Sequence, residues 1–121
     1  MKKKYLDTYA LIEIMNGNSN FAQYLTQDFI ITNITLAEFY AVILREENEK
    51  TANYWIKKLE PYSVKVETNI LIEAIRFKYK HKKQKISFFD AVGYIYSTNN
   101  NCVFVTGDKE FENMKFVEFK K

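Results

Sequence analysis

Four acidic residues stand where an ordinary surface charge is hard to explain: Asp7, Glu38, Asp90 and Asp108. Each of them ends or interrupts an apolar run, and three of them are among the only four aspartates in the chain. A carboxylate beside apolar segments costs free energy unless a cation compensates its charge. A divalent metal ion is the simplest such cation, because carboxylate oxygens are its preferred ligands. The pattern therefore indicates a metal site.

Short strands and helices alternate along the chain and must position these acids. We expect strands at residues 5–7, 29–32, 63–66, 103–106 and 116–119, helices at 8–15, 20–25, 35–46, 51–59, 69–80 and 88–98, and a helical turn at 109–111. Such alternation predicts a parallel sheet with right-handed crossovers and helices on both faces. The segment 88–98 is apolar nearly all round, which predicts a buried helix. We expect one α/β domain over residues 1–121.

This arrangement predicts that the four acids converge. Ligands of an open parallel sheet bind beyond the carboxyl ends of its strands. Asp7 ends the first expected strand, and Asp108 follows the fourth by two residues. Glu38 and Asp90 fall in the first turns of helices that enter from the same edge. All four should therefore lie on one rim of the sheet.

Helix capping offers a simpler interpretation of each acid taken singly. Residues 35–38 (Thr-x-x-Glu) form a capping box, residues 87–90 (Ser-x-x-Asp) form its close variant, and Asp7 and Asp108 could be N-caps. Capping does not explain four carboxylates on one edge, because they repel one another. Mg²⁺ or Mn²⁺ would offset that repulsion.

Four segments resemble the four motifs of the PIN-domain nucleases in order and spacing: YLDT at 5–8, TLAE at 35–38, ISFFDA at 86–91 and VTGDKEF at 105–111. The resemblance covers the whole chain, and the compact length is similar to VapC-like toxins of toxin–antitoxin pairs. It implies a three-layer α/β/α sandwich whose parallel sheet has the strand order 3-2-1-4-5. It also implies a Mg²⁺- or Mn²⁺-dependent ribonuclease with the acids as metal ligands.

The resemblance gives the site residues their roles. The direct metal ligands would be Asp7, Asp90 and Asp108, and Glu38 would ligate a metal or orient water. The hydroxyl groups of Thr106 and Thr8 are expected beside these ligands, with Thr106 holding a water molecule or an Asp108 oxygen. A metal would lower the pKa of the attacking water and stabilise charge on the phosphate.

A dense basic run at residues 78–85 precedes the Asp90 motif. Its candidate substrate-binding residues are Lys80, Lys82, Lys83 and Lys85. These lysines would contact RNA phosphates and make binding depend on salt. The alternative is a solvated helix end, where cations are favoured by the helix dipole.

Composition narrows the remaining classes of function. The net charge of +3 is too small to indicate nucleic acid by itself. The single cysteine, Cys102, excludes an intramolecular disulfide and a cysteine-based zinc site, and is expected to be buried. No apolar stretch approaches the roughly 20 residues of a membrane span, and no signal peptide is recognisable, so we expect a cytoplasmic protein without a membrane partner.

The expected partners are an RNA substrate and a small antitoxin protein. The alternatives are a housekeeping PIN-domain nuclease in RNA processing and a non-catalytic RNA-binding module. A receiver domain is disfavoured, because no aspartate follows the third expected strand. A homodimer is also open, for which Tyr54 and Trp55 would serve unless they belong to the core.

Overall fold

The computed structural model describes residues 2–121, and its centre is a parallel sheet of five strands in the order β3-β2-β1-β4-β5. The strands are β1 (Lys3–Leu6), β2 (Phe29–Thr32), β3 (Ser63–Val64), β4 (Cys102–Thr106) and β5 (Val117–Phe119). The central strand is β1, whose Leu6 lies opposite Val105 of β4. The expected α/β class and the strand order 3-2-1-4-5 are confirmed.

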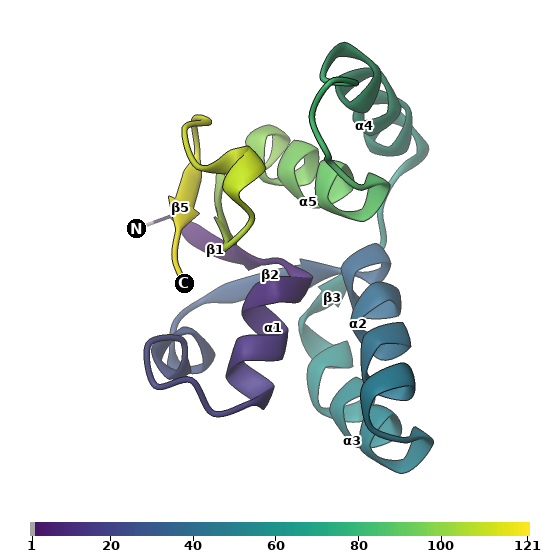
Figure 1. Ribbon diagram of the computed structural model, residues 1–121, viewed down its shortest axis with the longest axis vertical. Coiled ribbons are helices and arrows are strands. Elements are labelled where there is room, and N and C mark those ends of the chain that lie inside the picture. Colours follow the sequence, from purple (N-terminus) through teal and green to yellow (C-terminus); the bar gives the residue numbers. More distant parts are fainter. Residues whose placement is uncertain (1) are drawn as a thin grey trace.

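Helices form a layer on each face of this sheet (Figure 1). They are α1 (Thr8–Met15), α2 (Asn33–Glu46), α3 (Glu49–Leu59), α4 (Thr68–Lys80) and α5 (Phe88–Asn99), with short 3-10 turns η1 (Ala22–Thr26), η2 (Glu60–Tyr62) and η3 (Lys109–Phe111). One layer contains α1, α2 and α3, and the other contains α4 and α5.

The strands separate two apolar cores, because successive side chains point to opposite faces. Leu6 and Val105 pack in the core under α1, α2 and α3. Tyr5 and Phe104 pack in the other core, beneath α5. Phe39, with no exposed surface, also lies in the first core.

Some element bounds differ from the expected ones. The segment expected as a helix at 20–25 is the 3-10 turn η1, and β3 has two residues rather than four. Strand β3 ends early because the Val66 N–H donates to the Asn33 side chain at 3.3 Å instead of to a strand. Helix α2 begins at Asn33, two residues before its expected start. Helix α5 is largely buried, but Phe89 keeps 37% of its surface exposed.

Several expectations about single residues can be checked directly. Cys102 is buried at the start of β4. Trp55 packs edge-on against Phe39, with ring centres 6.3 Å apart, and so belongs to the core side of α3. Tyr54 beside it is 60% exposed. Within residues 2–121, no helix combines the length and the apolar composition that crossing a membrane requires.

Candidate metal and nuclease site

Asp7 lies directly after β1 and caps helix α1. Its Oδ1 accepts a hydrogen bond from the Ala10 N–H at 2.8 Å. The Thr106 hydroxyl hydrogen-bonds to the same carboxylate. Only 3% of Asp7 is exposed, so this acid sits in an environment where its charge is poorly solvated.

Asp108 lies at the same edge of the sheet, after β4. Its Oδ1 accepts from the Glu110 N–H at 3.0 Å and so caps η3. Its own N–H donates to the Thr106 Oγ1 at 3.0 Å. The buried Thr106 therefore joins the Asp108 backbone to the Asp7 carboxylate.

Glu38 reaches the site from the second turn of α2 rather than from its first. Thr32 is the N-cap of α2, and its Oγ1 accepts from the Thr35 N–H at 3.3 Å. The prediction of a capping box at residues 35–38 is therefore wrong. Glu38 instead accepts a hydrogen bond from the Thr8 hydroxyl at 2.5 Å, which joins α2 to the residue that follows Asp7.

Asp90 lies in the first turn of α5, as expected. Ser87 caps this helix, and its Oγ accepts from the Asp90 N–H at 3.1 Å. The Asp90 carboxyl group lies near that of Asp108, since the Asp108 charge acts on the Asp90 carboxyl group.

The electrostatics place the acids in one interacting group. Burial raises the pKa of Asp7 to about 8; the charges of Asp90 and Glu38 raise it too, although hydrogen bonds from Thr106 and from the Ala10 backbone lower it. Burial also raises the pKa of Asp90 to about 7, with further contributions from the charges of Glu38 and Asp108. Asp90 thus interacts with each of the other three acids.

No cationic side chain compensates this charge within residues 2–121. The ion pairs found there are Lys3–Asp28, Lys4–Glu118 and Arg45–Glu46, and none of them includes one of the four acids. No three His, Cys, Asp or Glu side chains in that part of the chain already stand at metal-binding distances from one another. The donor chemistry nevertheless fits a hard divalent cation, because all four groups are carboxylates whose mutual repulsion it would relieve.

Comparison with models of known protein families shows the family to which the chain belongs. The model of the PIN domain matches residues 4–117. The chain belongs to the PIN-domain family. A comparison with curated proteins found no match.

Several solved structures share this PIN fold over nearly the whole chain. VapC20 of Mycobacterium tuberculosis, described as a sarcin–ricin loop cleaving toxin, has a TM-score of 0.79 and 16% identity over 98% of this chain and 100% of its own. VapBC2 of Rickettsia felis, bound to a promoter DNA fragment, has 0.77 and 15% over 98% of each chain. A Klebsiella pneumoniae toxin–antitoxin complex has 0.75 and 17% over 96% of each. At such identities the likeness establishes the fold alone.

The basic run at residues 78–85 extends from the end of α4 into the loop between α4 and α5. The side chains of Lys80, Lys82, Lys83 and Lys85 are all exposed. The loop between α4 and α5 contacts the turn that follows Asp108, since the Lys85 N–H donates to the Glu110 Oε1 at 3.0 Å and Gln84 donates to the Glu110 carbonyl at 3.3 Å. This loop therefore lies on the side of the site that α5 and η3 form.

A close contact between Tyr9 and Gly107 was not foreseen from the sequence. A Cβ atom added to Gly107 would lie 2.3 Å from the Tyr9 ring, so any other residue there would force the ring to move. Gly107 directly precedes Asp108, and Tyr9 follows Asp7 by two residues. The ring thus packs the two acid-bearing segments together. The signal in the sequence was the glycine itself, because a buried glycine often marks a close approach.

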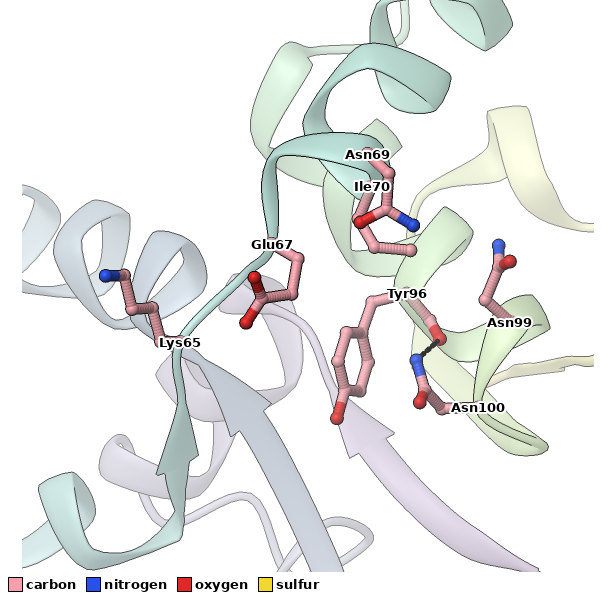
Figure 2. A pocket seen from close by; sticks show the side chains of 7 residues that line it. All are labelled: Lys65, Glu67, Asn69, Ile70, Tyr96, Asn99 and Asn100. Atoms are coloured by element: carbon pink, nitrogen blue, oxygen red, sulfur yellow. Dashed lines mark hydrogen bonds between the residues drawn. The ribbon is translucent and has the colours of Figure 1, made fainter.

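A polar hollow of about 370 Å³ lies apart from the acids. Figure 2 shows it between the β3–α4 connection, with Lys65 and Glu67, and the end of α5, where the Tyr96 ring points into it. The Asn100 amide donates to the Tyr96 carbonyl at 2.9 Å and closes one side. None of the four acids lines this hollow, so it is a separate feature of the surface.

Proposed function

We propose that this protein is a Mg²⁺- or Mn²⁺-dependent endoribonuclease that hydrolyses RNA phosphodiester bonds at the four acids, and that it is the toxin of a toxin–antitoxin pair. The observation that supports the site best is the raised pKa of both Asp7 and Asp90 in the absence of any cationic partner within residues 2–121. A group of carboxylates that repel one another in a PIN fold is suited to bind a divalent cation.

The side chains of the site would have different roles in metal binding and catalysis. Asp7, Asp90 and Asp108 would hold the cation, and Glu38 would ligate it or orient the attacking water. When bound, the cation supplies a water of lowered pKa and stabilises negative charge on the phosphate. Thr8 and Thr106 hold the carboxylates in place, through the bonds to Glu38 and to Asp7. The exposed lysines of the basic segment would bind the RNA backbone beside the site.

The toxin assignment is supported by the kind of proteins that share the fold. The Klebsiella complex contains a toxin with its antitoxin, and VapC20 is described as a sarcin–ricin loop cleaving toxin. An antitoxin side chain such as Arg or Lys would enter the acidic site and pair with its carboxylates. We expect the antitoxin's C-terminal segment to lie along the apolar surface near the first two helices. No observation favours the housekeeping role over the toxin role.

Cleavage of RNA with and without metal tests the enzyme assignment. Wild-type protein should cut RNA with Mg²⁺ or Mn²⁺ and lose that activity in EDTA. Asp7→Asn should remove a metal ligand and reduce cleavage by about 100-fold or more. Asp28→Asn is the matched control, because Asp28 is exposed, makes only a weak pair with Lys3 at 3.6 Å, and should cleave like wild type. Metal-independent RNA binding without cleavage would instead indicate a non-catalytic module.

Co-purification tests the toxin assignment separately. The product of the neighbouring gene should bind this protein and inhibit its cleavage of RNA. If that product neither binds nor inhibits, the toxin role fails while the nuclease role stands, and a housekeeping nuclease becomes the better assignment.

A further inference from the structure

A fully buried phenol joins β1 to the beginning of α2. The Tyr5 hydroxyl lies 2.9 Å from the Thr32 Oγ1 and 2.7 Å from the Thr35 Oγ1. Tyr5 and Thr32 have no exposed surface, and Thr35 has 2%. A phenol can donate one hydrogen bond and accept another, so this hydroxyl is fully used by the two threonines.

Packing alone does not require this hydroxyl. The Tyr5 ring lies among aromatic side chains, with ring centres 5.7 Å from Phe104 and 5.8 Å from Tyr96, and phenylalanine would fill the same place. Burying a hydroxyl group is costly unless it is hydrogen-bonded. The oxygen therefore has a role of its own, and both of its partners belong to the N-terminus of α2.

These partners control where α2 begins. Thr32 caps the helix by accepting from the Thr35 N–H, and Tyr5 bonds to the hydroxyl groups of both. Glu38 follows Thr35 by three residues, so it lies on the same face of the helix one turn further on. On its other side, Glu38 bonds to Thr8. Helix α2 is thus hydrogen-bonded to Tyr5, two residues before Asp7, and to Thr8, one residue after it.

We propose that Tyr5 is a positioning residue for Glu38 and that it acts through its hydroxyl group. It fixes the N-terminus of α2 against β1 and thereby sets the place of the Glu38 carboxylate relative to Asp7. The hydroxyl acts through α2 and does not contact the substrate.

The test compares Tyr5→Phe with Tyr24→Phe. Both changes remove one phenolic oxygen from a tyrosine with no exposed surface, but the Tyr24 hydroxyl donates to Glu118 of β5 and not to a residue of α2. In RNA cleavage at saturating metal, Tyr5→Phe should lower kcat about 10- to 100-fold. KM should change little, because the RNA contacts stay in place. Tyr24→Phe should leave kcat unchanged even if it lowers the melting temperature.

A double-mutant cycle separates positioning from a general loss of stability. In a Glu38→Gln background, Tyr5→Phe should have almost no further effect on kcat, because the group that it positions is already lost. An equal loss in both backgrounds would overturn the proposal. Thr35→Ser keeps the hydroxyl partner and should behave like wild type, whereas Thr35→Val should reproduce Tyr5→Phe.

Hydrogen exchange gives a readout that does not depend on nuclease activity. The kinetic tests presuppose the proposed ribonuclease function, but exchange at the first amides of α2 does not. These amides should exchange about 10-fold faster or more in Tyr5→Phe and at the wild-type rate in Tyr24→Phe. If wild type cleaves no RNA but this difference is found, the proposed function fails and the positioning role holds. Equal exchange in both variants would overturn the positioning role.

Discussion

Neutralising Asp90 should stabilise the metal-free protein at alkaline pH. The variant Asp90→Asn keeps the size and polarity of the side chain and removes its charge. Each tenfold change in ionisation corresponds to about 1.4 kcal/mol, so the increase in the Asp90 pKa from 3.8 to about 7 corresponds to roughly 4 kcal/mol. Solvent screens part of this interaction, because Asp90 is only half-buried. We therefore expect the free energy of unfolding of Asp90→Asn to exceed that of the wild type by about 2–4 kcal/mol at pH 8 in EDTA.

The sign of the pH dependence follows from the direction of the shift. Below pH 3.8 Asp90 is protonated in both the folded and the unfolded state. Between pH 3.8 and about 7 the unfolded chain releases the proton and the folded one retains it, so the free energy of unfolding falls as pH rises through this window. Asparagine does not titrate. The advantage of Asp90→Asn should therefore be smallest near pH 4 and greatest above pH 7.

Thermal unfolding in EDTA at several pH values measures this difference. A change of 1 kcal/mol moves the melting temperature of a domain of this size by about 3–5 °C. Asp28→Asn serves as the control, because it removes an exposed carboxylate that lies outside the group of four acids. If Asp90→Asn melts below wild type at pH 8, the ionised carboxylate stabilises α5 as a first-turn acid, and the reasoning from repulsion is refuted.

Three further results are expected from the same site. Added Mg²⁺ at 100 times its Kd should raise the free energy of unfolding of the wild type by about 2.7 kcal/mol, and hence its melting temperature. The increase should be smaller for Asp90→Asn, and equal increases would place the cation elsewhere. Replacing the four lysines of residues 80–85 by glutamine should reduce the slope of log affinity against log salt concentration by about 0.7 per lost phosphate contact. Fluorescence anisotropy with single-stranded RNA, in the inactive Asp7→Asn background, measures this slope. An unchanged slope would identify a solvated helix end. Gly107→Ala should lower the free energy of unfolding by about 1–3 kcal/mol, because the added methyl group meets the Tyr9 ring. In a Tyr9→Ala background, Gly107→Ala should cost much less, and a loss that persists without the ring would contradict this contact.

The sequence alone predicted the order of the elements, and with it the edge on which the acids meet. Strands and helices alternate with different apolar periods, and this signal is independent of tertiary contacts. Asp7 and Asp108 could be placed because each follows a strand directly or nearly so. The family resemblance supplied the strand order, and the sheet agrees with it.

The start of α2 was not predictable because its sequence offers two suitable caps. Thr32 and Thr35 both have hydroxyl groups that can cap a helix, and local propensity does not choose between them. In the folded chain both hydroxyl groups contact Tyr5, which is distant in sequence and hydrogen-bonds to both. Similarly, β3 is shortened by a bond from Val66 to the Asn33 side chain, which only the folded chain brings together.

Capping and metal binding are not alternative explanations of Asp7. Its carboxylate does cap α1, yet two hydrogen bonds that favour its charged form fail to offset burial and the neighbouring acids, and its pKa remains near 8. Asparagine would supply the same capping oxygen about as well without that repulsion. The cap therefore accounts for an oxygen at this position but not for a charge. A charge that is unfavourable in the isolated protein becomes favourable only when a cation is bound, and this is the physical reason to expect one at this edge of the sheet.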